Sequence, residues 1–224
     1  MQDAEVLEIG IEKRPLIVID GFLPDADALR TEAECAAFQP FVRFFPGVQA
    51  PFSFDRMREF IAPHEGLIGD AFHLAAFPRL IECGFALVTT KPSDLAPLQR
   101  IPHIDTTDPQ RLAILAYISG CQFGGTAFYR HKSTGFESID DAKVETYNRT
   151  LDLDIERHGV PAPSYIAGDT PLFDLIAKID AKPGRAIIYN SNSLHSGHIE
   201  NAHRLQSSPA TGRLTLNAFL SGNA

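Results

Sequence analysis

One histidine and one aspartate stand two residues apart in the segment QRIPHIDTTDPQ, at His103 and Asp105, and three more histidines gather near the end of the chain, at His195, His198 and His203. The proline before His103 favours an extended backbone, in which alternate side chains point to the same side. An imidazole and a carboxylate suit Fe(II), Mn or Zn, and one further histidine completes a triad that leaves coordination positions open. The pattern predicts a metal site whose third ligand comes from the late histidine cluster. The alternative is a loop histidine beside a capping aspartate.

A second chemical feature is the alternation in GRLTLNAFL near the end of the chain. Arg213, Thr215, Asn217 and Phe219 share one face of this predicted strand, and the other face carries only aliphatic side chains. A buried guanidinium needs an anionic partner, and a neighbouring hydroxyl would complete a site for a carboxylate. The strand therefore predicts an anion site, with a surface salt bridge at the end of the strand as the alternative.

The composition limits the classes of protein that can position these residues. The chain has 224 residues, of which 44% are apolar, and 20 basic against 28 acidic residues give a net charge of −8. This length and apolar fraction favour a single domain spanning residues 1–224. The scattered basic residues argue against nucleic acid as a partner. The acidic N-terminus and the lack of a long apolar run predict a cytoplasmic protein without a membrane segment. No pattern indicates an oligomeric state.

The first part of the domain, residues 1–83, has one predicted strand and supporting helices. PLIVID, at residues 15–20, is typical of a buried strand. The segment from Leu23 to Phe38 carries Pro24 and acids at its start and then apolar residues at helical spacing, so it predicts a helix. Ser53 is a suitable N-cap for a second helix.

The second part, residues 84–224, is richer in β-prone runs. Five runs predict strands: GFALVTT, LAILAYIS, TAFY, AIIYN and RLTLNAFL. Helical spacing predicts a helix inside an insertion at about residues 138–167, ending at Gly159, and another helix in TPLFDLIAKI. The fold class is thus mainly β with α (α+β), an antiparallel sandwich or jelly roll flanked by N-terminal helices.

Four segments in order, PHID, GGTAFY, PGRAIIYNSNSLHSG and GRLTL, resemble the Fe(II)/2-oxoglutarate-dependent dioxygenase superfamily in its prolyl-hydroxylase-like branch, over roughly residues 85–221. The opening LIVIDGFLPDADALR is also similar to the start of that branch. The resemblance implies a double-stranded β-helix with Fe(II) as the metal and 2-oxoglutarate as the cosubstrate. It also implies hydroxylation of a substrate with release of succinate and CO2.

The resemblance also selects the metal ligands. It implies that His103, Asp105 and His195 are the catalytic residues that bind Fe(II), because His195 follows a strand that begins after a Pro-Gly turn. With His195 as the ligand, His198 and His203 fall in the connecting segment as surface or substrate-proximal residues. If His195 is not the ligand, His198 is the substitute.

The cosubstrate residues follow from the same resemblance. Arg213 and Thr215 match the arginine and hydroxyl that hold the far carboxylate of 2-oxoglutarate, and Arg204 does not. The hydroxyl of Tyr117 is a further candidate donor to the cosubstrate, with an ordinary core tyrosine as the alternative.

Two other functions stay open from the sequence. One is a cupin-like metal enzyme that does not use 2-oxoglutarate, and the other is a non-catalytic jelly-roll binding module. For an oxygenase, the expected partner is a small molecule or a protein side chain, and the sequence does not choose between them. The insertion at about residues 138–167 is a candidate lid, because it lies between two strands.

Overall fold

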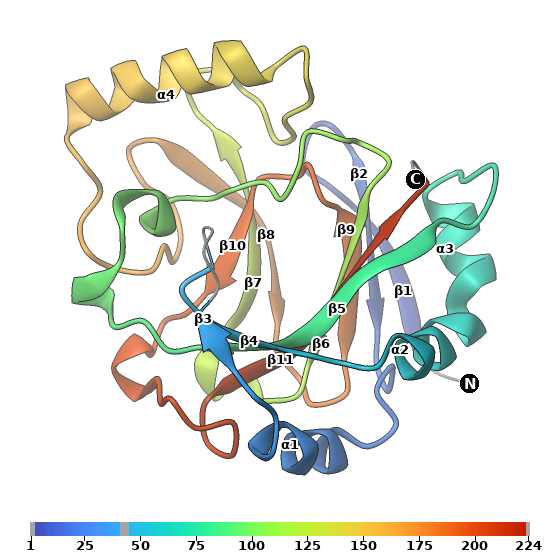
Figure 1. The fold of residues 1–224 in the computed structure, drawn as a ribbon. Coiled ribbons are helices and arrows are strands. Elements are labelled where there is room, and N and C mark those ends of the chain that lie inside the picture. The colour runs from blue at the N-terminus through green and yellow to red at the C-terminus, as the bar shows by residue number, and fades with distance from the viewer. Residues whose placement is uncertain (1–2, 41–44, 223–224) are drawn as a thin grey trace.

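The computed structural model describes residues 3–40 and 45–222 of the chain, and it is built mainly from β-strands in two sheets with helices outside them (Figure 1). The α-helices are α1 (Ala26–Glu34), α2 (Phe54–Ile61), α3 (Glu65–Ala71) and α4 (Val144–His158). Short 3-10 helices are η1 (Ala62–His64), η2 (Pro92–Asp94), η3 (Pro97–Arg100), η4 (Cys121–Phe123) and η5 (Ala202–Arg204). Within these described ranges, no helix has the length and apolar character needed to cross a membrane.

Within the described residues, the larger sheet has eight antiparallel strands and takes them from both parts of the chain. Their order across the sheet is β1 (Ala4–Ile9), β2 (Arg14–Ile19), β9 (Ala186–Asn190), β6 (Leu112–Tyr117), β11 (Arg213–Ser221), β5 (Arg79–Val88), β4 (Gly47–Pro51) and β3 (Gln39–Pro40). The last strand of the chain, β11, lies between β5 and β6, and its register pairs Thr215 with Ala86 on one side and with Tyr117 on the other. This central position gives the residues of β11 neighbours on both sides.

The smaller sheet has three antiparallel strands in the order β10 (His195–His198), β7 (Gly125–His131) and β8 (Phe173–Asp180). Helix α4 lies in the connection between β7 and β8. A pair of glycines allows the backbone at the start of β7 to lie very close to the backbones of its neighbouring strands. Gly124 has φ +83°, and a Cβ atom there would collide with the carbonyl of His198, while one on Gly125 would collide with the carbonyl of Ile179.

The first three helices cover the outer face of the larger sheet. Leu29 of α1, Met57 of α2 and Ile68 of α3 are buried in one cluster with the aliphatic face of β11. Local signals explain where two of these helices begin, because Asp25 and Ser53 accept N-capping bonds from backbone N–H groups three residues further on. The helices thus seal the side of the sheet that faces away from the smaller one.

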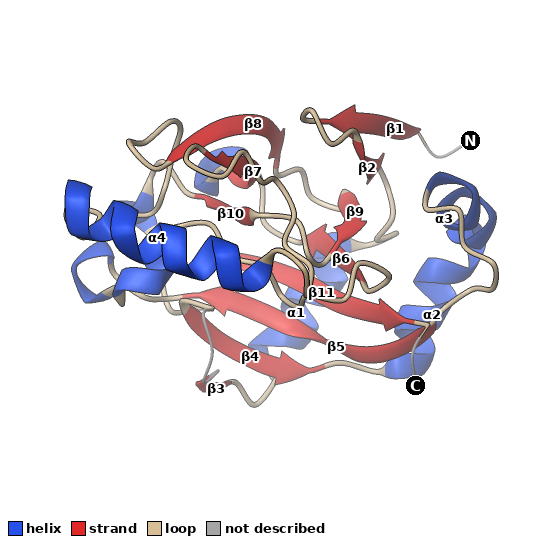
Figure 2. Cartoon of the chain, turned by 90° about the horizontal axis from the view of Figure 1, so that it is seen from above, coloured by secondary structure: helices blue, strands red, loops and turns tan. Residues whose placement is uncertain are grey.

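The inner face of the larger sheet packs toward the smaller sheet, and α4 covers the far side of the smaller sheet. Phe128 of β7 joins Ala113, Tyr189 and Leu16 of the larger sheet in a buried cluster. On the other side of β7, Tyr129 packs with residues of α4. Figure 2 shows α4 beside the strands of the smaller sheet and α2 and α3 at the opposite side of the molecule. The molecule is therefore layered, and the two sheets face each other.

Most predicted elements are present, but one has the wrong type. The strand at residues 15–20, the five later strands, the helices after Pro24 and Ser53 and the helix that ends at Gly159 are all observed within a few residues. TPLFDLIAKI is not a helix, because Phe173–Asp180 forms β8, which is hydrogen-bonded along β7. A short apolar run satisfies both helical and extended patterns, and the partner strand decides between them.

Candidate active site

The segment that holds His103 and Asp105 is tied to the start of β10 by the backbone. The N–H of His103 donates to the carbonyl of His195, and the N–H of His195 donates back to His103, both at 2.9 Å. Asp105 N–H donates to the carbonyl of Ser191, also at 2.9 Å. These bonds keep the segment extended, so the side chains of His103 and Asp105 point to the same side, as the sequence predicts.

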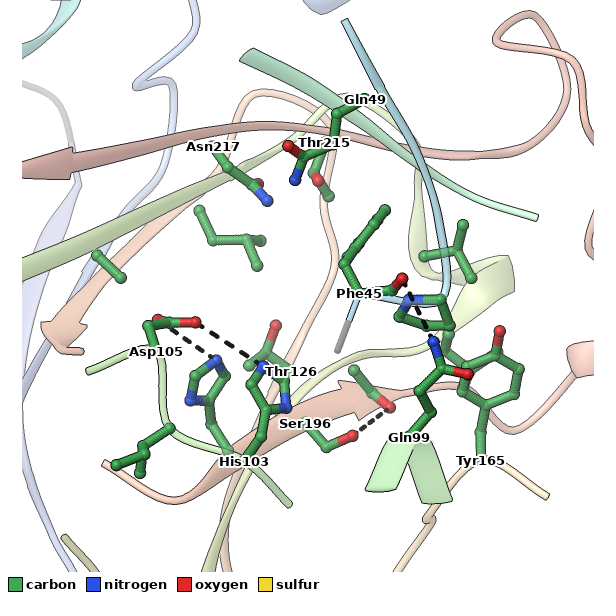
Figure 3. A pocket seen from close by; sticks show the side chains of 18 of the residues that line it. Phe45, Gln49, Gln99, His103, Asp105, Thr126, Tyr165, Ser196, Thr215 and Asn217 are labelled. Carbon is green, nitrogen blue, oxygen red and sulfur yellow. Dashed lines mark hydrogen bonds and ion pairs between the residues drawn. The ribbon is translucent and has the colours of Figure 1, made fainter. Parts of the chain in front are cut away.

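His103, Asp105 and His195 form a cluster that could hold one metal ion. One ligand atom from each residue can be chosen so that all of them lie within 4.8 Å of one another. The Nε2 atoms of His103 and His195 lie 3.8 and 3.9 Å from the two carboxylate oxygens of Asp105. Figure 3 shows the carboxylate of Asp105 joined by dashed lines to two imidazole rings. Two imidazoles and one carboxylate are a ligand set suited to Fe(II), Mn or Zn.

A backbone carbonyl orients the ring of His195. Its Nδ1 lies 2.9 Å from the carbonyl oxygen of Ser193, which can only accept a hydrogen bond, so Nδ1 carries the proton. Nε2 therefore keeps its lone pair on the side that faces Asp105. A carbonyl bonded to the second ring nitrogen is the usual support of a metal-binding histidine.

The electrostatics of the cluster also fit a cation. Burial, and then the neighbouring His195, lower the pKa of His103 well below its ordinary value, so this imidazole is neutral and one of its ring nitrogens offers a lone pair to a metal. Burial raises the pKa of Asp105 in spite of the opposing effects of His195 and Arg111. Oδ2 of Asp105 is inaccessible and has no hydrogen-bond partner among the described residues. A cation would compensate this buried carboxylate.

The cluster lies in a pocket of about 850 Å³ between the sheets. Thr126 and Ser196 come from the smaller sheet, Thr215 and Asn217 come from the larger one, and Tyr165 comes from the segment after α4 (Figure 3). The rest of the lining is largely apolar. The volume and the few polar groups are typical of a site for a small ligand.

Arg213 lines this pocket from the first position of β11 and is buried, with 4% of its surface exposed. Its Nη2 donates to the carbonyl of Gly125 at 2.8 Å, and its Nε has no partner in the described part of the chain. In the pairing of β7 with β10, Gly125 lies three residue pairs along the strands from the pair that contains His195. This separation is about 10 Å along the strand. A buried guanidinium with free donors near the cluster fits a ligand carboxylate, because a lone buried charge is costly.

The two other predicted cosubstrate residues lie in different settings. Thr215 lines the pocket two residues after Arg213 on the same face of β11. Tyr117 lies behind the lining and donates its hydroxyl to Thr126 at 2.7 Å. Burial raises the pKa of Tyr117 to about 12, although the bond to Thr126 opposes this rise. Thr126 is therefore the group through which Tyr117 reaches the pocket, and direct contact of Tyr117 with a cosubstrate stays a prediction.

The other late histidines lie outside the cluster. His198 is on β10, with its Nε2 3.0 Å from the carboxylate of Glu200. His203 is exposed in η5. The structure thus brings His195, and neither His198 nor His203, to the His103 and Asp105 pair.

Several residues of the site were given no role at this site from the sequence. Ser193 orients His195 through its main chain, which leaves no signal in residue type. Thr126 directly follows the glycine pair, and that position could have marked it. Tyr189 lines the pocket and contacts the ring of His195, with 4.9 Å between the ring centroids. Arg111 precedes β6 on its pocket-facing side.

Comparison with known families gives one match. The model of a family of unknown function (DUF6445) matches residues 2–220. No curated protein matches the chain.

Solved structures are similar to this chain at low sequence identity. HygX from Streptomyces hygroscopicus with nickel and 2-oxoglutarate bound has a TM-score of 0.54 and 12% identity, and the alignment covers 95% of this chain and 84% of HygX. HygX with nickel, 2-oxoglutarate and hygromycin B bound has a TM-score of 0.51, 13% identity and the same coverage. A Pseudomonas putida prolyl-4-hydroxylase has a TM-score of 0.47 and 15% identity, with 96% of both chains covered. The likeness to HygX shows a common fold.

Proposed function

Since the chain belongs to the DUF6445 family of unknown function, its own site has to indicate the activity, and we propose that it is an Fe(II)- and 2-oxoglutarate-dependent oxygenase. The observation that carries the proposal is one pocket containing both a His–Asp–His cluster and a buried arginine with free donors. The cluster would bind a metal ion, and the arginine would bind a carboxylate. Neither feature is explained by packing alone, because each leaves buried polar atoms without partners.

In this proposal His103, Asp105 and His195 hold Fe(II), while Arg213 and Thr215 bind the far carboxylate of 2-oxoglutarate. When bound, iron and 2-oxoglutarate supply the O2-dependent chemistry that hydroxylates a C–H bond, with succinate and CO2 as products. The chain's own contribution is to orient the ligands and keep the pocket apolar. The carbonyl of Ser193 holds the proton on Nδ1 of His195, so that Nε2 stays available. The apolar lining limits water near the reacting atoms.

The fold supports this assignment. We take the two facing antiparallel sheets as a double-stranded β-helix, or jelly roll, and HygX has the same overall fold with nickel and 2-oxoglutarate bound. The substrate in this proposal is a small molecule or a protein side chain.

The decisive experiment is an anaerobic titration of the apoprotein with Fe(II) and then 2-oxoglutarate, monitored by the visible charge-transfer band of a keto acid chelated to iron. The variants are His103→Ala, Asp105→Ala and Arg213→Ala. Arg204→Ala is the matched control, because Arg204 is an exposed arginine of η5. Circular dichroism of each variant checks that the fold is retained.

We expect the band in the wild type and in Arg204→Ala. His103→Ala and Asp105→Ala should bind iron weakly, whereas Arg213→Ala should bind iron normally and need at least about tenfold more 2-oxoglutarate, because a charged hydrogen bond is lost. Tight iron binding without a band would instead support a cupin-like metal enzyme. Absence of metal binding would support a non-catalytic binding module.

A further inference from the structure

Among the described residues, two arginines line the pocket, and they lie toward opposite ends of it. Arg213 is the first residue of β11. Arg111 lies over the ring of Phe219, which follows Arg213 by six residues on β11. At about 3.3 Å per residue, the α-carbons of Arg213 and Phe219 are roughly 20 Å apart. The arginines are therefore suited to two different anionic groups.

The metal cluster is nearer to Arg111 along the strands. The ring of His195 contacts Tyr189, and Tyr189 pairs with Ala113 on β6, which in turn pairs with Phe219. A ligand group bound by Arg111 would thus lie beside the metal cluster, on the side away from Arg213.

Arg111 has unused hydrogen-bonding capacity. Its Nε is inaccessible and has no partner among the described residues. Its Nη2 is 3.8 Å from the carboxylate of Glu82, which is beyond hydrogen-bond length. The ring of Phe219 lies 4.4 Å from the centre of the guanidinium and holds that plane in place. A fixed guanidinium with free N–H groups is suited to bidentate binding of a carboxylate.

The surroundings of Arg111 limit the charge and shape of its ligand. Glu82 is close enough to repel a second negative charge, which favours a carboxylate over a phosphate dianion. Between the arginines the wall offers the apolar side chains of Ala113 and Leu115 and the unpartnered amide oxygen of Asn217. These groups are suited to contact with a small ligand that is mostly apolar apart from its charged group.

We propose that Arg111 determines substrate specificity, and that the substrate is a small organic acid whose single carboxylate binds Arg111 and whose apolar part lies against β6 and β11. This inference rests on the proposed oxygenase function, because it assigns Arg213 to the cosubstrate and leaves Arg111 for the substrate. The inference therefore favours a small molecule over a protein side chain as the substrate.

The test uses saturation-transfer NMR with the full chain loaded with Zn(II) and 2-oxoglutarate. The probes are three acids, each beside its primary amide: hexanoate and hexanamide, phenylacetate and phenylacetamide, and N-acetyl-leucine and its amide. Arg111→Gln removes the charge, Arg111→Lys keeps it, and Glu82→Gln removes the repulsion. Arg204→Gln is the control for loss of an arginine elsewhere.

We expect at least one acid to bind the wild type at least about tenfold more tightly than its amide, because the charged hydrogen bonds are lost in the amide. This preference should disappear in Arg111→Gln, persist in part in Arg111→Lys, increase in Glu82→Gln and be unchanged in Arg204→Gln. The proposal is overturned if no acid binds, if amides bind equally well, or if Arg111→Gln keeps the preference.

The iron titration separates this inference from the proposed function. Arg111→Gln should give the same charge-transfer band as the wild type at the same 2-oxoglutarate concentration. A lost acid preference with a normal band is the expected result. A weakened band in Arg111→Gln would contradict the division of roles between the two arginines. If the wild type itself gave no band, the oxygenase proposal would fail, and the acid preference could still be measured without 2-oxoglutarate.

Discussion

His195 is positioned by two contacts that the residue type alone does not reveal. Its ring nitrogen Nδ1 donates to the carbonyl of Ser193, and its backbone exchanges hydrogen bonds with His103. His198, three residues later, is equally buried but faces Glu200. Two histidines on one short strand can therefore have different roles, because positions three residues apart on a strand face opposite sides.

This difference gives a prediction for metal binding. His195→Ala should lower the affinity for Co(II) at least about tenfold, since loss of even a supporting contact to a metal ligand has an effect of this size. His198→Ala is the matched control and should leave the affinity unchanged. Isothermal titration of both apoproteins with Co(II) measures the affinities. A larger loss in His198→Ala than in His195→Ala would make His198 the third ligand.

At the scale of single residues, the sequence indicates candidate site residues where side chains carry the signal, and their roles stay predictions. His103, Asp105, Arg213 and Thr215 are recognisable because their types and their period of two residues are visible in the sequence, and the structure places them on one pocket. The choice of His195 from three candidates needed the resemblance to a family. The support from Ser193 could not be predicted, because a backbone carbonyl is present at every position.

At the scale of elements, prediction succeeded for strands with strong alternation or a continuous apolar run and failed for β8. The segment Phe173–Asp180 mixes apolar and charged residues, and its extended form depends on β7, which lies more than forty residues earlier in the sequence. The strands β1, β3, β4 and β10 were not predicted either. Three of these, β3, β4 and β10, have five residues or fewer, so a window of sequence carries little periodic signal.

Helix α4 is attached to the smaller sheet by buried groups, which bears on its predicted role as a lid. Asp154 of α4 has an oxygen 3.1 Å from Nε2 of His131 on β7, and the other ring nitrogen of His131 lies 2.9 Å from Thr134. Tyr147 and Leu151 of the same helix are buried beside them. From the region that follows α4, Tyr165 lines the pocket. The helix thus packs firmly on the smaller sheet and the segment after it forms part of the pocket wall, while a lid role for the insertion stays a prediction.

The contact between α4 and β7 gives a prediction for stability. Asp154→Ala should lower the free energy of unfolding by about 1 to 3 kcal/mol, because buried His131 loses its partner. Asp152→Ala, at an exposed position on the same helix, should change it by less than about 0.5 kcal/mol. Urea unfolding followed by circular dichroism measures both. Equal effects of the two substitutions would show that the pair with His131 does not fasten the helix.

At the scale of the whole molecule, buried histidines on both sides of the fold connect stability with pH. His64, at the end of η1, packs on Phe22 with 5.4 Å between ring centroids, and burial lowers its pKa. Burial also lowers the pKa of His131, although Asp154 opposes this. An unfolded histidine has a pKa of about 6.5. Below that pH the unfolded chain binds protons that the folded chain binds only at lower pH, so acidification favours unfolding.

The free energy of unfolding should therefore fall as the pH is lowered from 7 to 5. Each such histidine contributes at most about 1.4 kcal/mol per pH unit. His64→Phe keeps an aromatic ring against Phe22 and removes one titrating group, so its dependence on pH should be weaker than that of the wild type. Urea unfolding at a series of pH values compares the two slopes. Identical slopes would mean that His64 is protonated equally in the folded and unfolded states.

The reciprocal backbone bonds between His103 and His195 join positions about ninety residues apart, and the segment that carries α4 lies between them. The candidate metal site is thus divided along the chain. A cut between α4 and β8 would leave His103 and Asp105 on one fragment and His195 on the other. Neither fragment would carry the complete ligand set, so recovery of metal affinity on mixing them would report the noncovalent reassembly of the two halves.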